Sequence, residues 1–211
     1  SYAELSVKDA LRRMGVIAAA MHRDALVALG MDETHLAREG VAMDDEVDRF
    51  NLYIVRLLKV AVTDGHVLKE SGLNSPRDCL GYRLITKSVE RMADHAVNIA
   101  QNRLALTLTT VNDEILNELT RLSEFALEVF ENAMESVFDE DYSEADEVLE
   151  LELKTREMEA EVLHKILKQA NPDEIPALRL IIESISRTAG YGADIAETVL
   201  NMTVRDAVIE A

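Results

Sequence analysis

The chain has 211 residues, and its hydrophobic share of 48% is enough for a substantial core in one domain or two small ones. Its net charge of −18 argues against non-specific nucleic-acid binding, which depends on Lys and Arg neutralising phosphates. With only three prolines and eight glycines, and no tryptophan, the composition favours long helices.

The remaining composition predicts a cytoplasmic protein that does not span a membrane. The single cysteine, Cys79, allows no internal disulfide and favours a reducing compartment. No apolar run approaches the roughly eighteen residues needed to cross a bilayer. The first residues also lack the basic and then apolar pattern of a secretory signal.

The negative charge lies almost entirely in the second half of the chain. Residues 1–108 contain 14 Lys and Arg against 15 Asp and Glu, a net charge of −1, so residues 109–211 carry the remaining −17. Two interpretations stay open for this acid-rich half. It is either a solvated surface that keeps the protein soluble or a docking face for a basic partner.

Helical periodicity predicts three long helices in the first half. The first runs from about residue 6 to residue 29, and the second from about residue 32 to residue 69, where Ser71-Gly72 breaks the pattern. Asn74-Ser75-Pro76 supplies a cap and a proline at the first helical position, so a third helix follows, to about residue 106. Its apolar stripe steps by three and four residues through Tyr82, Ile85, Val89, Met92, Ala96 and Ile99.

The second half repeats this plan. A shift of 108 residues aligns the stripes of the first two helices with those of a helix after Asn112 and a helix over about 143–170. A shift of 96 aligns the third helix with a last helix that follows Asn171-Pro172-Asp173. Because the shift falls by twelve, the connection at 64–75 is longer than its counterpart, and it is a candidate recognition feature.

We therefore predict an all-α fold of six long helices. They form two tandem, pseudo-symmetric, antiparallel three-helix bundles, with domain limits at 1–108 and 109–211. No segment shows period-two alternation with β-branched enrichment, so we predict no strands.

Acidic residues on the second and third helices carry the main functional signal. Asp44 and Asp48 are four residues apart, as are Glu90 and Asp94, so each pair lies one turn apart on one helix face. On adjacent helices the two pairs can hold one cation. Two further oxygen donors lie nearby, Asp45 and Asn98.

Oxygen ligands suit hard cations, so iron, manganese, magnesium or calcium is expected at this site. Zinc fits less well because it prefers nitrogen and sulfur, which only His95 offers nearby. The alternative is a solvated helix face whose carboxylates pair with Lys87 and Arg91. No catalytic residue is predicted, because the sequence has no nucleophile motif, no phosphate-cradling glycine loop and no Glu-x-x-His motif repeated on two helices.

Three of these four carboxylates are replaced at the aligned positions of the second half, by Arg156, Ser186 and Gly190. Glu152 remains, and Asp194 is a weak second remnant. Because a guanidinium repels cations, we expect an ion pair between Glu152 and Arg156 in place of a metal. Gly190 and Gly192 lower helix propensity, so the last helix is expected to be kinked or closely approached there.

Two segments carry a resemblance to a known family, namely Glu90-Arg91-Met92-Ala93-Asp94-His95-Ala96-Val97-Asn98-Ile99-Ala100 and Asp44-Asp45-Glu46-Val47-Asp48-Arg49. Set in duplicated three-helix units, they resemble the PhoU family of phosphate-uptake regulators over nearly the whole chain. The resemblance implies two similar bundles whose acidic motifs bind metal ions on the bundle surface. It also implies a non-enzymatic negative regulator that contacts a phosphate transporter and, in bacteria, a membrane sensor kinase.

The expected function is thus that of an adaptor. Its expected partner is a phosphate transporter subunit or a signalling protein at the cytoplasmic membrane face, and homo-oligomerisation stays open. Two alternative functions stay open. One is a PhoU-like regulatory domain of a potassium-transport regulator, and the other is a metal-binding or storage protein that uses the carboxylates of the first half.

Overall fold

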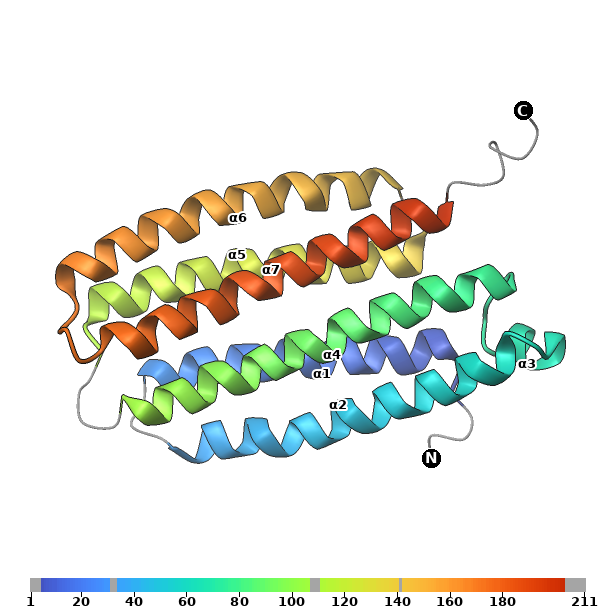
Figure 1. Ribbon diagram of the computed structural model, residues 1–211, viewed down its shortest axis with the longest axis horizontal. Coiled ribbons are helices and arrows are strands. Elements are labelled where there is room, and N and C mark those ends of the chain that lie inside the picture. The colour runs from blue at the N-terminus through green and yellow to red at the C-terminus, as the bar shows by residue number, and fades with distance from the viewer. Residues whose placement is uncertain (1–4, 31–33, 107–110, 141, 204–211) are drawn as a thin grey trace.

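A computed structural model describes residues 5–30, 34–106, 111–140 and 142–203, and this part of the chain contains helices and no strand. Figure 1 shows the helices, which are α1 (Val7–Gly30), α2 (Thr34–Ala61), α3 (Gly65–Glu70), α4 (Pro76–Ala105), α5 (Asp113–Asp139), α6 (Tyr142–Gln169) and α7 (Ile175–Thr203). The all-α fold and its six long helices are confirmed, and α3 is a short addition. No helix in the described residues is long and apolar enough to cross a membrane.

The long helices form two three-helix bundles that lie side by side. α1, α2 and α4 pack together in the first bundle, and α5, α6 and α7 in the second. Across the junction between the bundles, α4 packs on α7 and α1 contacts α5. The remaining long helices, α2 and α6, lie on the two outer sides (Figure 1).

Helix lengths reproduce the internal repeat. A shift of 108 residues places the bounds of α2, Thr34–Ala61, on those of α6, Tyr142–Gln169. The third helices of the two bundles, α4 and α7, have 30 and 29 residues. Residues 107–110, at the predicted boundary between the two domains, lie outside the described residues, so the predicted domain limits stay a prediction.

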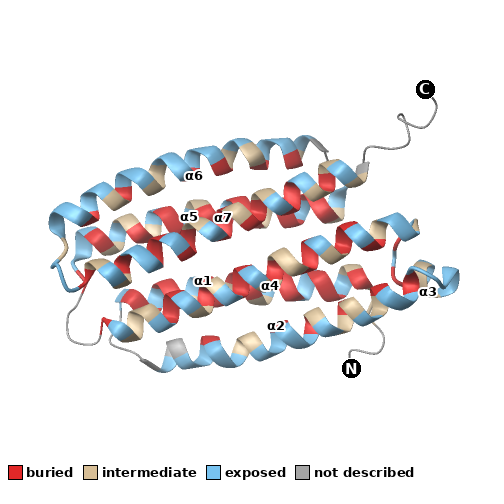
Figure 2. Cartoon of the chain, in the orientation of Figure 1, coloured by how far each residue is buried: buried red, intermediate tan, exposed pale blue. Residues whose placement is uncertain are grey.

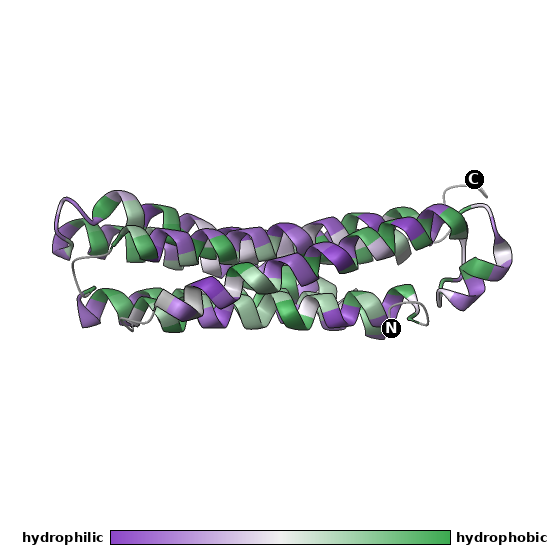
Figure 3. Cartoon of the chain, turned by 90° about the horizontal axis from the view of Figure 1, so that it is seen from below, coloured by the Kyte–Doolittle hydropathy of each residue, from purple (hydrophilic) through white to green (hydrophobic). Residues whose placement is uncertain are grey.

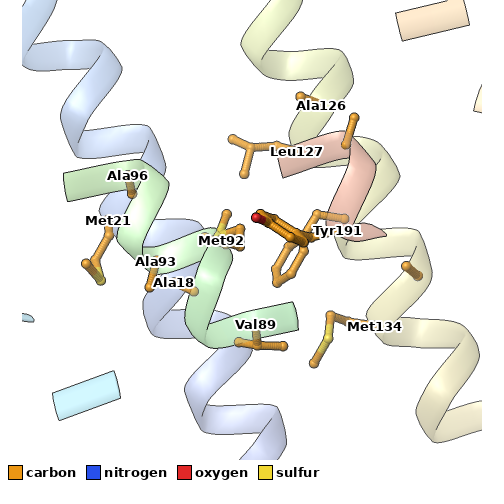
Figure 4. Close-up of a cluster of buried hydrophobic side chains, with 14 of the residues drawn as sticks. Ala18, Met21, Val89, Met92, Ala93, Ala96, Ala126, Leu127, Met134 and Tyr191 are labelled. Carbon is orange, nitrogen blue, oxygen red and sulfur yellow. The ribbon is translucent and has the colours of Figure 1, made fainter. Parts of the chain in front are cut away.

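One apolar stripe of each long helix faces inward, and these stripes form the core (Figure 2). The stripe predicted for α4 is completely buried, at Tyr82, Ile85, Val89, Met92, Ala96 and Ile99. The core continues across the junction, where Met92 of α4, Leu127 of α5 and Tyr191 of α7 lie close together (Figure 4). Fully burying one such large side chain stabilises the fold by roughly 1.5–3 kcal/mol.

Polar and apolar residues alternate around the long helices when the molecule is seen from below (Figure 3). On α2, for example, Val47, Phe50 and Ile54 are buried while Asp48 and Leu52 are exposed. This one-sided burial is the pattern expected of amphipathic helices that cover a core.

The prediction for the second helix was wrong at its C-terminal end. α2 stops at Ala61 rather than near residue 69, and a separate helix, α3, begins after Asp64. The Asp64 carboxylate accepts hydrogen bonds from the backbone N–H groups of His66 at 2.9 Å and Val67 at 3.2 Å. Because Asp64 caps the start of α3, the chain leaves the helical conformation between α2 and α3. The apolar spacing continues past this point and does not reveal the interruption.

The predicted longer connection between α2 and α4 is present, and hydrogen bonds hold it near both ends. Gly72 has a φ of +77°, a left-handed conformation that glycine adopts at little cost. The backbone N–H of Val7 donates to the carbonyl of Ser71 at 3.2 Å, which ties the connection to the start of α1. The predicted cap of α4 is present, because the Asp78 carboxylate accepts the backbone N–H of Ser75 at 3.0 Å. This cap fixes where α4 begins.

Candidate metal site

The four predicted carboxylates come from the two helices that pack against each other in the first bundle. Asp44 and Asp48 lie one turn apart on α2, and Glu90 and Asp94 lie one turn apart on α4. Asp44 and Glu90 are half-buried, whereas Asp48 and Asp94 are exposed. The cluster therefore lies at the edge of the core.

The charges of these side chains act on one another. Although Asp94 is exposed as a residue, partial burial of its carboxyl group, and then the neighbouring charges of Glu90, Asp44 and Asp48, raise its pKa to about 6, against a smaller lowering by Lys87. Burial also raises the pKa of Asp44, helped by Asp48, Asp45 and Glu90. Ionising this cluster is therefore unfavourable without a compensating cation, because like charges penalise the charged state.

The donor set fits a hard cation in its chemistry. Oδ1 of Asp44 is buried and has no hydrogen-bond partner among the described residues, so a strong acceptor is left unsatisfied at the α2 and α4 contact. The Lys87 ammonium pairs with the Glu90 carboxylate, which is the ion pair that the alternative interpretation expects. Within the described residues, no three His, Cys, Asp or Glu side chains converge as a ready-made metal site. Metal binding here therefore stays a prediction.

The two additional oxygen donors lie at the edges of the cluster. Asp45 is exposed and contributes to the raised pKa of Asp44. Asn98 is exposed one turn beyond Asp94, and its backbone carbonyl accepts a hydrogen bond from the side-chain amide of Asn102 at 2.8 Å.

The matching place in the second bundle is built differently. Glu152 is buried and accepts a hydrogen bond from Nε of Arg156, the predicted ion pair. Among the described residues, Ser186 Oγ is buried without a hydrogen-bond partner, and a Cβ at Gly190 would have no packing neighbour within 4 Å. Asp194 is exposed two turns beyond Ser186 on α7. An arginine and small residues thus occupy the positions that carry carboxylates in the first bundle.

A family model for the PhoU domain matches the chain twice, over residues 11–102 and residues 119–199. The chain belongs to the PhoU family. One match falls in each bundle, so the acidic cluster lies within the first PhoU domain and the pair of Glu152 and Arg156 within the second. No curated protein matches the chain.

Solved PhoU structures share this fold over almost their full length. The phosphate transport system regulatory protein PhoU from Streptococcus pneumoniae has a TM-score of 0.80 at 17% identity, covering 94% of this chain and 93% of that one. PhoU from Pseudomonas aeruginosa has a TM-score of 0.78 at 17% identity, with 93% and 94% covered.

The junction between the two PhoU domains contains a polar row that sequence reasoning missed. His22 of α1 is completely buried, and its two ring nitrogens share hydrogen bonds with Ser123 Oγ of α5 at 2.8 Å and Thr188 Oγ1 of α7 at 3.3 Å. Burial, with a smaller contribution from Arg23, lowers the pKa of His22 to about 3. These partners are 101 and 166 residues away along the chain, so no local spacing announces them.

A second histidine extends this row to the edge of the junction. His95 of α4 shares a hydrogen bond between Nδ1 and Ser184 Oγ of α7 at 3.1 Å, and its ring lies 5.7 Å from that of Tyr191. Burial, and then Arg187, lower its pKa. His95, next to Asp94 in sequence, therefore joins the first domain to the second.

Proposed function

We propose that this chain regulates phosphate transport by binding rather than by catalysis. The observation that supports this best is the PhoU-domain match in both bundles, joined to a fold that agrees with solved PhoU structures over more than nine-tenths of their length. One of those structures is described as a phosphate transport system regulatory protein. Its partner would be a transporter subunit or a signalling protein at the cytoplasmic membrane face, and binding would lower phosphate uptake.

We also propose that a hard cation bound by Asp44, Asp48, Glu90 and Asp94 stabilises the regulator. Iron, manganese, magnesium or calcium suits these oxygen donors. The repulsion between Asp94 and its neighbouring carboxylates and the unsatisfied Oδ1 of Asp44 both favour such a cation. Bound there, the cation would crosslink α2 to α4 and compete with Lys87 for Glu90.

Phosphate and potassium uptake in a deletion strain test the regulatory proposal. Loss of this chain should raise phosphate uptake in phosphate-rich medium, and the wild-type gene should restore repression. Unchanged phosphate uptake together with altered potassium uptake would replace the proposal with the potassium-transport alternative. Repression that is lost with Glu90→Gln/Asp94→Asn would connect the acidic cluster to regulation.

Metal content per chain tests the cation proposal separately. Wild type should retain manganese or iron after dialysis and melt at a higher temperature with the metal added. Glu90→Gln/Asp94→Asn should lose that metal, whereas the matched change Glu152→Gln/Asp194→Asn in the second domain should keep it. Equal loss in both variants would contradict a site confined to the first domain.

A further inference from the structure

A groove runs between α1 and α5, across the junction of the two domains. Its volume is about 530 Å³, and no residue of α4 or α7 lines it. Figure 1 shows α4 and α7 crossing in front of α1 and α5. From Arg12 to Arg23, its α1 side extends about 16 Å, the length of three helical turns.

Apolar side chains form the floor of this groove. Val16 of α1 lines the groove and is 66% exposed. The α5 side is lined by a helical stripe of Leu127, Phe130, Met134 and Phe138, of which the first three are buried and Phe138 is half-buried. Gly15 lets Met134 pack closely on α1, since a Cβ at Gly15 would come within 2.8 Å of the Met134 Cε.

The two long edges of the groove differ in charge. The α5 edge carries four glutamates at helical spacing, Glu124, Glu128, Glu131 and Glu135. The α1 edge carries Arg12 and Arg23, and both side chains contact residues of α5. Arg12 lies 4.0 Å over the ring of Phe138, and Arg23 forms an ion pair with Glu131. Glu124, Glu128 and Glu135 are exposed, and none of them forms an ion pair with another residue that the structure describes.

From this arrangement we infer that the α1/α5 groove binds an amphipathic helix of a partner protein, with its apolar face on Val16 and its basic flank along the α5 edge. An apolar groove of three turns takes apolar residues spaced by three and four, as helix-binding grooves do. Lysines or arginines on one flank would meet the unpaired glutamates, and the two arginines of α1 would exclude the reverse orientation. The inference does not depend on which transport system the chain regulates.

Fluorescence anisotropy with the full chain tests this inference. The probe is a fluorescein-labelled synthetic helix of about fourteen residues, with leucines along one face and lysines along one flank. A second probe carries glutamates in place of the lysines. The lysine probe should bind, with a Kd that weakens as salt is added, and the glutamate probe should bind at least about tenfold more weakly. Equal binding of the two probes would overturn the charge complementarity.

Matched variants locate the site. Val16→Lys should weaken binding of the lysine probe by about tenfold or more, because it places a cation on the apolar floor. Val27→Lys, at a 47% exposed position of α1 outside the groove, should leave the Kd within about twofold. Circular dichroism melts of both variants establish that they fold. Equal Kd values for the two variants would remove the groove as the binding site.

A second pair of variants tests the acidic edge without touching the floor. We expect Glu124→Gln/Glu128→Gln to weaken binding of the lysine probe and to make its Kd depend less on salt. Asp146→Asn/Glu150→Gln, a pair with the same spacing on α6, should change neither. Sedimentation of the unlabelled chain tests whether a second copy of the chain occupies the groove instead. A wild-type dimer that Val16→Lys dissociates would show that a second copy fills the groove, and it would overturn the inference.

Discussion

The negative charge of Asp94 is destabilised by its surroundings in the acidic cluster. Its pKa of about 6 lies above the ordinary value of 3.8, so the folded protein binds a proton there more tightly than the unfolded chain does. The stabilising protonated state is present at low pH and is lost as the pH rises through about 6. At neutral pH, without a cation, the Asp94 charge therefore lowers the free energy of unfolding.

Asp94→Asn should consequently stabilise the metal-free protein at pH 7.5. We expect its melting temperature to rise by about 1–3 °C in the presence of a chelator, and the difference from wild type to vanish near pH 4. Added manganese should reverse the order, since the variant loses a ligand. Glu150→Gln, an exposed change on α6, serves as the control. A variant that melts lower at pH 7.5 with chelator would contradict the assigned charge repulsion.

His22 has the opposite pH dependence. Because its folded pKa of about 3 is below the ordinary 6.5, the unfolded chain takes up a proton first as the pH falls. The free energy of unfolding should therefore decrease between about pH 6.5 and pH 3, by an amount on the order of a few kcal/mol. Denaturant titrations of wild type and His22→Gln at several pH values measure this. Parallel pH profiles would show that His22 does not titrate on unfolding.

At the scale of the helix, α7 tolerates two glycines for different reasons. The helix continues from Ile175 to Thr203 without a break, and the close approach expected near the two glycines is found at Gly192. At Gly192 an added Cβ would come within 3.0 Å of the Val129 carbonyl oxygen and 3.1 Å of the Phe130 Cα on α5. At Gly190 the same atom would meet open space.

Alanine at these two positions should act in opposite directions. Gly190→Ala should raise the free energy of unfolding by about 0.5–1 kcal/mol, because alanine has the higher helix propensity and nothing obstructs it. Gly192→Ala should lower it by roughly 1–3 kcal/mol, because the backbone of α5 has to move. Urea denaturation measures both changes. Stabilisation by Gly192→Ala would contradict the close packing of α7 on α5.

At the scale of the whole molecule, the net charge of −18 opposes compaction. Ion pairs such as Lys8 with Glu140 and Lys165 with Glu118 involve partly exposed side chains and offset little of it. Screening should therefore stabilise the protein. We expect the melting temperature to rise by about 2–4 °C between about 20 mM and 300 mM NaCl, near neutral pH and without divalent metal.

The acid-rich second half should account for most of this salt effect. Asp146→Asn/Glu150→Gln removes two exposed charges from α6 and should flatten the dependence of melting temperature on salt. Arg38→Gln, which removes an exposed cation from α2, should steepen it. A melting temperature that falls with salt would mean that attractive ion pairs outweigh the repulsion.

Local sequence pattern determined most of the architecture and part of the candidate site. Steps of three and four residues encode which side of a helix is apolar, so the buried stripe of α4 and the duplicated bundle plan could be read directly. The same spacing placed Asp44 with Asp48 and Glu90 with Asp94, and it paired Glu152 with Arg156. These features depend on neighbours within one turn of one helix.

Only the tertiary structure decided how the helices meet. The partners of His22, the α1/α5 groove and the contact of Gly192 with α5 all join segments far apart in sequence, and helical periodicity carries no information about them. The end of α2 at Ala61 depended on Asp64 capping α3, a competition between two local signals that apolar spacing does not resolve. Contacts between distant segments follow from the shapes and charges of two surfaces at once, and each surface exists only when the chain has folded.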